Sequence, residues 1–367
     1  MKKNLFGWLA MATMLVGTGC STDEVVNDYS PENAIQFSTY VGKNADGRAS
    51  IVDVDVIGND GFGVFAYYTN QTPWANYSEK DTPNFMNNTQ VTKQGSEWHY
   101  SPLKYWPNND DAMVTFFAYA PWQNGASDSQ IVLNNTEAKL DFTVENNVKD
   151  QVDLIWSSSN YVDANKQTVD GEVEFVFKHA LSRIGFTVQA AVNQVAPGGS
   201  IDEHTVITLN RIVLGTNTNG FFETGTLDLN AATATWTNQE GEQSFELNAT
   251  NGNFIQNSNV LTSASNTQVL LMDKDVDGED DFLMIIPENM EDLSVYIEYT
   301  VATDAGNADE SVITNTITRT INEINFVAGN AYTLNLVLGM TSVKISATVE
   351  SWNEQTGNQV DLPLNLN

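Results

Sequence analysis

The segment that carries the fold prediction reads Ile35-Gln36-Phe37-Ser38-Thr39-Tyr40-Val41. Alternate side chains of an extended chain lie on one face, so the odd-numbered residues of this segment would cover a hydrophobic groove. These residues are Ile35, Phe37, Thr39 and Val41.

The same alternation continues through the rest of the chain, in β-branched and aromatic segments separated by Gly, Asn and Asp. Clear examples are residues 61–68, 113–119, 152–156, 173–177, 184–188, 206–214, 282–286, 293–301, 312–321, 332–338 and 343–349. No stretch of a dozen residues carries an apolar stripe of helical period. Many short strands with turn signals between them predict an all-β fold of antiparallel sandwiches.

The length of 367 residues exceeds what one hydrophobic core usually serves, so we expect two domains. We place an N-terminal domain over 34–172 and a C-terminal domain over 173–367. The turn Pro197-Gly198-Gly199 is a second candidate boundary. The Asn- and Thr-rich stretch from about 230 to 268 is expected to form long surface loops with short strands.

The N-terminus predicts export. Lys2 and Lys3 precede the apolar run 5–16, and small residues lead to Cys20, the one cysteine of the chain. This pattern indicates a signal peptide over 1–19, too short to span a bilayer as a helix. A thiol at this place is the lipidation site of bacterial lipoproteins, although Gly17 stands where their signal usually has leucine. The other interpretation is a secreted protein with an incidental cysteine.

Residues 20–33 would form an acidic tether, either a solvated linker or an acidic surface-export signal like those of Bacteroidota lipoproteins. The whole chain is acidic as well, with 47 Asp and Glu against 16 Lys and Arg and a net charge of −31. Such a field repels nucleic acid, which we therefore exclude as a partner. One cysteine provides neither a disulfide nor a thiolate metal site.

Catalytic signatures are missing from the sequence. His99, His179 and His204 are scattered, and no G-x-S-x-G elbow, HExxH pair or phosphate loop occurs. His179 is interpreted as a structural hydrogen-bonding residue. We predict a protein that is not an enzyme and uses no cofactor; a glycosidase would need a carboxylate pair that nothing in the sequence singles out.

One acidic segment imitates a calcium loop. Asp273, Asp275 and Asp277 precede Gly278 as in an EF-hand, but the twelfth position is Met284 instead of glutamate. We expect an acidic hairpin turn there and a weak calcium candidate at most.

Aromatic residues gather over 98–107 and again over 116–122. An exposed platform would suggest carbohydrate binding, whereas aromatic residues beside strands are more often buried, and we favour burial.

Several segments, in order along the chain, resemble the Mfa-like branch of the fimbrillins, the type V pilus subunits of Bacteroidota. They are Phe62-Gly63-Val64-Phe65-Ala66-Tyr67, residues 98–107, Phe116-Phe117-Ala118-Tyr119-Ala120-Pro121, Phe177-Lys178-His179-Ala180-Leu181-Ser182-Arg183, Leu283-Met284-Ile285-Ile286-Pro287, residues 329–336 and Val349-Glu350-Ser351-Trp352. The resemblance implies two tandem transthyretin-like β-sandwich domains behind a lipoprotein signal.

The resemblance also implies assembly by strand exchange, in which an arginine-directed protease removes the first strand and a neighbour supplies its replacement. Here the strand 35–41 is followed by a small polar loop and by Arg48-Ala49, the candidate cleavage site. The other interpretation of Arg48 is an ordinary surface residue.

The C-terminal segment 359–367 is the donor-strand candidate. Four of its side chains alternate on one face: Val360, Leu362, Leu364 and Leu366. The other interpretation, with equal weight, is that this segment is the last strand of its own domain. Pro363 removes one amide donor from it.

Together these observations predict a structural or adhesive fimbrial subunit, exported as a lipoprotein to the outer membrane and the cell surface or fimbrium. Its partners would be other fimbrial subunits, the outer membrane through the lipid, and a host or glycan ligand. The alternative is a non-polymerising surface lipoprotein that binds a glycan or a host protein.

Overall fold

The structure is a computed structural model. It describes residues 33–41, 57, 60–126, 129–134, 138–157, 161–191, 201–216, 219–248, 259–264, 267–269, 283–351 and 360–362. These residues form four β-sheets with two short 3-10 helices, η2 (Trp74–Asn76) and η3 (Val148–Asp150). The all-β prediction is confirmed.

The first sheet has seven strands. Their order is β1 (Gln36–Val41), β9 (Glu172–His179), β8 (Ile155–Ser157), β5 (Met113–Ala120), β2 (Phe62–Asn70), β3 (Met86–Gln94) and β4 (Glu97–Tyr100). A second sheet has four strands, in the order β13 (Trp236–Glu240), β12 (Thr224–Asp228), β7 (Lys139–Thr143) and β6 (Ile131–Asn134).

Two further sheets complete the molecule. The six-stranded sheet runs β16 (Thr267–Val269), β10 (Ser182–Ala190), β20 (Asn330–Leu338), β21 (Val343–Ser351) and β22 (Val360–Leu362), with β17 (Leu283–Ile285) also paired to β10. The five-stranded sheet runs β14 (Phe245–Asn248), β11 (Val206–Leu214), β18 (Asn289–Thr303) and β19 (Ser311–Asn325), with β15 (Val260–Leu261) paired to β11.

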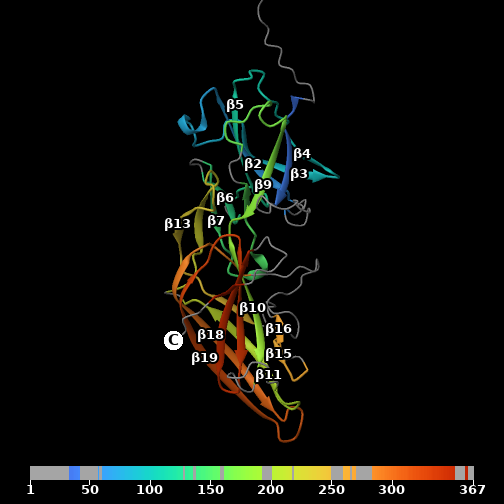
Figure 1. Cartoon of the computed structure of the whole chain (residues 1–367), viewed down its shortest axis with the longest axis vertical. Coiled ribbons are helices and arrows are strands. Elements are labelled where there is room, and N and C mark those ends of the chain that lie inside the picture. Colours follow the sequence, from blue (N-terminus) through green and yellow to red (C-terminus); the bar gives the residue numbers. More distant parts are fainter. Residues whose placement is uncertain are drawn as a thin grey trace, which may run out of the picture.

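The sheets follow one another along an elongated molecule. Figure 1 shows the seven-stranded sheet near one end, β6, β7 and β13 in the middle, and β10, β11, β18 and β19 at the other end. The core is continuous through the middle, because one hydrophobic cluster includes Phe117 of the first sheet, Phe142 of the second and Ile297 of the fourth.

The expectation of purely antiparallel sheets needs correction at two places. β1 pairs parallel with β9, and β10 pairs parallel with β20. Parallel neighbours need a long crossover connection, and here the intervening strands of other sheets supply it. Short-range alternation in sequence does not reveal such long-range partners.

The expected boundary at residue 172 falls at the start of β9. Because β9 pairs with β1 and β8, we place residues 172–179 with the first sheet. The four-stranded sheet also joins β7 from one side of that boundary to β12 from the other. The division into two tandem domains remains a prediction.

The central strands of the first sheet are buried on both faces. In β2, Phe65 and Tyr67 face the large cluster, whereas Phe62, Val64 and Ala66 face a second cluster of their own. This second cluster is the interior that β1 covers.

Candidate functional site

The first strand, β1, lies along β9 at one end of the seven-stranded sheet. Its register pairs Phe37 with Val173 and Thr39 with Phe175. Ile35 is 1% exposed and Phe37 is 5% exposed, whereas Gln36 between them is exposed. Thr39 is half-buried, and only the backbone of Val41 is described. The alternation seen in the sequence therefore places Ile35 and Phe37 inside the fold.

Phe37 lies at the centre of an aromatic cluster. Its ring centroid is 5.2 Å from that of Tyr100, 5.6 Å from Phe175, and 6.2 Å from both Phe62 and Phe116. These four rings belong to β4, β9, β2 and β5. One side chain of β1 thus contacts four other strands of the sheet, and removing β1 would expose apolar surface from all of them.

The second edge of β1 faces β4 and the segment that follows it. Ile35 donates its backbone N–H to the carbonyl oxygen of Lys104 at 2.9 Å, and Ala34 bridges to Tyr105. Trp106 donates its backbone N–H to the carbonyl oxygen of Asn33 at 3.0 Å. β1 therefore joins the two ends of the sheet and closes it around the second cluster.

Tyr100 fixes this closure from β4. Its hydroxyl donates to the carbonyl oxygen of Ile35 at 2.8 Å. Burial raises the pKa of Tyr100 to about 12, although a hydrogen bond from the backbone N–H of Lys104 opposes the rise. The phenol is therefore a stable donor to β1 at neutral pH.

The aromatic segment 98–107 packs against the second cluster beside β1. Trp106 is 4% exposed and donates its indole N–H to the carbonyl oxygen of Gly171 at 2.9 Å. Trp98 is half-buried against Phe62, with ring centroids 5.0 Å apart. The expectation of burial is confirmed for Trp106, and Leu103 is the exposed large apolar residue of the segment.

The donor-strand candidate is described only at Val360–Leu362. This short strand, β22, pairs antiparallel with β21 at the edge of the six-stranded sheet, with Val360 opposite Val349 and Leu362 opposite Ala347. Its role as a donor remains a prediction, as does the exchange of β1.

The other predicted site residues lie outside the described residues. They are the lipidation candidate Cys20, the cleavage candidates Arg48 and Ala49, the donor residues Leu364 and Leu366, and the calcium candidates Asp273, Asp275 and Asp277. Within the described residues, no three His, Cys, Asp or Glu side chains are placed to share a metal ion. In the same part of the chain, no helix has the length and apolar character needed to cross a membrane.

His179 ends β9, where the chain leaves the first sheet. Its Nδ1 lies 2.8 Å from a carboxylate oxygen of Asp153, and its side chain is 6% exposed. This buried pairing agrees with the structural role expected for His179.

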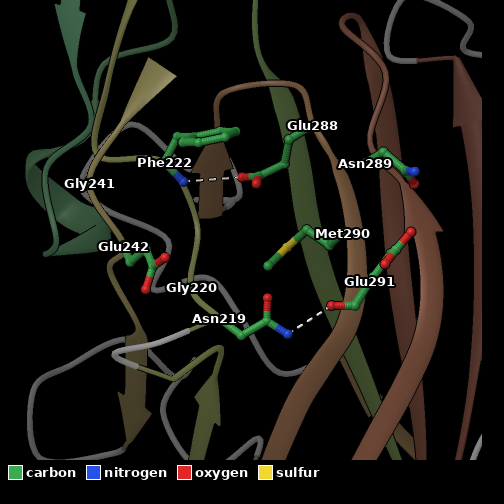
Figure 2. Close-up of a pocket in the computed structure, with 9 residues that line it drawn as sticks. All are labelled: Asn219, Gly220, Phe222, Gly241, Glu242, Glu288, Asn289, Met290 and Glu291. Atoms are coloured by element: carbon green, nitrogen blue, oxygen red, sulfur yellow. Dashed lines mark hydrogen bonds between the residues drawn. The ribbon is translucent and has the colours of Figure 1, made fainter. Parts of the chain in front are cut away.

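A polar cleft of about 330 Å³ lies between the loop before β12 and the start of β18. Figure 2 shows Glu288 directed at the backbone of Phe222, whose N–H donates to Glu288 Oε1 at 3.2 Å. Asn219 closes the lower side by donating to the carbonyl oxygen of Glu291 at 2.7 Å (Figure 2). Burial raises the pKa of Glu288 to about 7, and the hydrogen bond from Phe222 partly opposes the rise.

Sequence reasoning did not identify Glu288. It also did not identify Tyr100 and Phe175 as residues that contact Phe37 of β1. Glu288 follows Pro287 after an ordinary strand, and its burial comes from a loop some 66 residues earlier. Tyr100 and Phe175 belong to recognisable strands, but their approach to Phe37 depends on which strands are neighbours.

Comparisons with known proteins agree on one class. A family described as fimbrillin-like matches residues 47–352. The fimbrium subunit Fim1C of Phocaeicola vulgatus is 27% identical over 387 aligned positions, which cover 96% of this chain and 98% of that protein. A crystal structure of a fimbrial protein from Bacteroides vulgatus superposes with a TM-score of 0.66 at 24% identity, covering 87% of this chain and 99% of that one.

Proposed function

Since the chain belongs to the fimbrillin-like family, we propose that it is a structural subunit of a cell-surface fimbria, assembled with other fimbrial subunits by strand exchange. The observation that carries the proposal is the position of β1. It is a terminal strand of the seven-stranded sheet, and its Phe37 packs in an aromatic cluster formed by four other strands. A strand of the same alternation from a neighbouring subunit would fit the same groove.

The energetics favour replacement of β1 over an empty groove. Burying Ile35 and Phe37 contributes about 1.5–3 kcal/mol each. An incoming segment must supply comparable apolar side chains, and 359–367 offers four at the same spacing. We propose this segment as the donor, with release of β1 following cleavage between Arg48 and Ala49.

Export would precede assembly. We propose that the signal peptide is removed before Cys20, that the cysteine is lipidated, and that the acidic tether carries the subunit to the outer surface of the cell. Cleavage after Arg48 would then separate the assembled subunit from its anchor, since Cys20 precedes Arg48 in the chain.

The alternative function, glycan or host-protein binding without polymerisation, has weaker support. Trp106, in the aromatic segment 98–107 that would form a carbohydrate platform, is buried and hydrogen-bonded to Gly171, so it is not available to stack on a sugar. Leu103, 54% exposed in the same segment, is the feature that favours a ligand there.

The experiment that tests strand exchange is arginine-specific proteolysis of the full chain. We expect wild-type protein to be cut after Arg48 and then to form a ladder of polymers that resists mild denaturant. The variant Arg48→Ala should stay uncut at this loop and form no polymer ladder under the same treatment. Lys43→Ala changes a neighbouring basic residue and serves as the matched control, with wild-type behaviour.

Complete cleavage after Arg48 without any polymer would contradict the proposal that this subunit forms a homopolymer. Mass spectrometry of the cut product establishes the N-terminus, and release of the fragment containing β1 establishes whether the groove was vacated.

A further inference from the structure

The strand β19 forms one edge of the five-stranded sheet at the end of the molecule opposite to β1 (Figure 1). Within the described residues it pairs with β18 over its full length, from Ser311 to Asn325. Its second edge has no strand partner there. A long edge of this kind can accept a further strand.

The usual protections of an edge strand are missing from β19. It contains no proline and no lysine, and its two charged residues are Arg319 and Glu323. Val312 and Ile313 are each 57% exposed. Adjacent residues of a strand point to opposite faces, so one of these side chains lies on each face. At this end both faces of β19 are therefore exposed, although Val301, opposite Ile313 on β18, is buried.

The charge of the molecule points to the occupant. Copies of a chain with a net charge of −31 repel one another over most of their surface. Residues 311–319 carry one charge, the positive Arg319, while the adjoining turn contains the exposed acidic residues Asp309 and Glu310. Between Arg319 at one end and these carboxylates at the other, the edge offers a second copy a strip without charge.

We propose that β19 is a self-pairing edge, on which a second copy of this chain adds its own β19 antiparallel with Asn315 opposite Asn315. In this register Ile313 of each copy lies opposite Ile317 of the other, and Thr314 lies opposite Thr316. Arg319 lies opposite Ser311 and diagonally from Asp309, within reach of a long side chain.

The charges also disfavour one of the two neighbouring registers. Centring the pair on Thr316 would place Asp309 of one copy opposite Glu323 of the other, which like charges disfavour. The other, centred on Thr314, would place Asp309 opposite Arg319, but Ile313 would then lie opposite Asn315 and the pairing of Ile313 with Ile317 would be lost. The self-pairing uses neither β1 nor residues 359–367, so it would operate between uncut subunits and does not depend on strand exchange.

Sedimentation of the uncut chain tests the proposal, over about 1–200 µM because short strand additions bind weakly. We expect a reversible dimer whose dissociation constant rises at least about tenfold in Ile313→Lys, since two lysines would then enter the paired edge. Val327→Lys, at another exposed apolar residue outside β19, is the matched control and should dimerise like wild type. Circular dichroism melting verifies that both variants fold.

A disulfide test establishes the register in a Cys20→Ser background. Asn315→Cys should form a disulfide-linked dimer on mild oxidation, because two residues opposite each other lie within bonding reach. Val312→Cys should not, since the two copies of residue 312 would be about 20 Å apart. A chain that stays monomeric throughout, a dimer unaffected by Ile313→Lys, or a link at residue 312 instead of 315 would each overturn the proposal.

Discussion

Phe37 is the side chain on which the seating of β1 depends, because its ring contacts four aromatic rings of other strands. We expect Phe37→Ala to lower the free energy of unfolding of the uncut chain by about 3–5 kcal/mol, since the cavity would lie in a packed cluster. Urea titration measures the change. Gln36→Ala, at the exposed neighbour, should stay within about 0.5 kcal/mol of wild type, and equal losses in the two variants would mean that Phe37 is not an anchor.

Glu288 makes a second prediction at the same scale. Its pKa is about 7 in the fold, above the ordinary value of 4.5, so between these values the folded chain holds a proton that the unfolded chain releases. Stability should therefore fall as pH rises from about 4.5 through 7, by at most about 3 kcal/mol.

The pH effect is measured as the difference in unfolding free energy between pH 5 and pH 8. Glu288→Gln should remove this part of the pH dependence, because the amide stays neutral throughout. Glu291→Gln removes a carboxylate from an exposed residue that lines the same cleft and should keep the wild-type slope. Identical slopes in all three proteins would assign the pH dependence to other groups.

At the scale of elements, a vacated groove should accept a strand in trans. After cleavage at Arg48, a synthetic peptide of residues 359–367 should bind the cut subunit and stop polymer growth, because it offers four apolar side chains to the groove. The same peptide with Leu362→Asp should bind much more weakly, since a carboxylate would enter an apolar cluster. Fluorescence anisotropy of labelled peptides measures both, and equal binding would remove 359–367 as the donor.

Elements defined by their own alternation were predictable from sequence. The segment 206–214 matches β11 at both ends, and 113–119 lies within β5. In β1, the burial of Ile35 and Phe37 follows from the same alternation. The pairing partners were not predictable, because the pairing of β1 with β9 joins residues 136 positions apart, such as Gln36 and Glu172. The clustering of Phe37 with Tyr100 and Phe175 depends on that pairing.

For the whole molecule, the sheet of β6, β7, β12 and β13 links the two ends of the chain's fold. Leu140 of β7 and Leu227 of β12 are cross-strand partners in one continuous core that reaches Phe117 at one end and Ile297 at the other. We infer that the two ends unfold together, because the buried apolar residues described in this region belong to one hydrophobic cluster.

Net charge decides how copies of the whole molecule approach one another. At −31 each, two subunits repel at long range, and salt screens this repulsion within about 10 Å at 0.1 M. Polymer growth after cleavage at Arg48 should therefore be several-fold faster at high than at low sodium chloride, because the encounter is the step that charge opposes. Light scattering measures the rate, with a neutral osmolyte at equal osmolality as the control. A rate that falls with salt would instead indicate that opposite charges guide the donor segment to its groove.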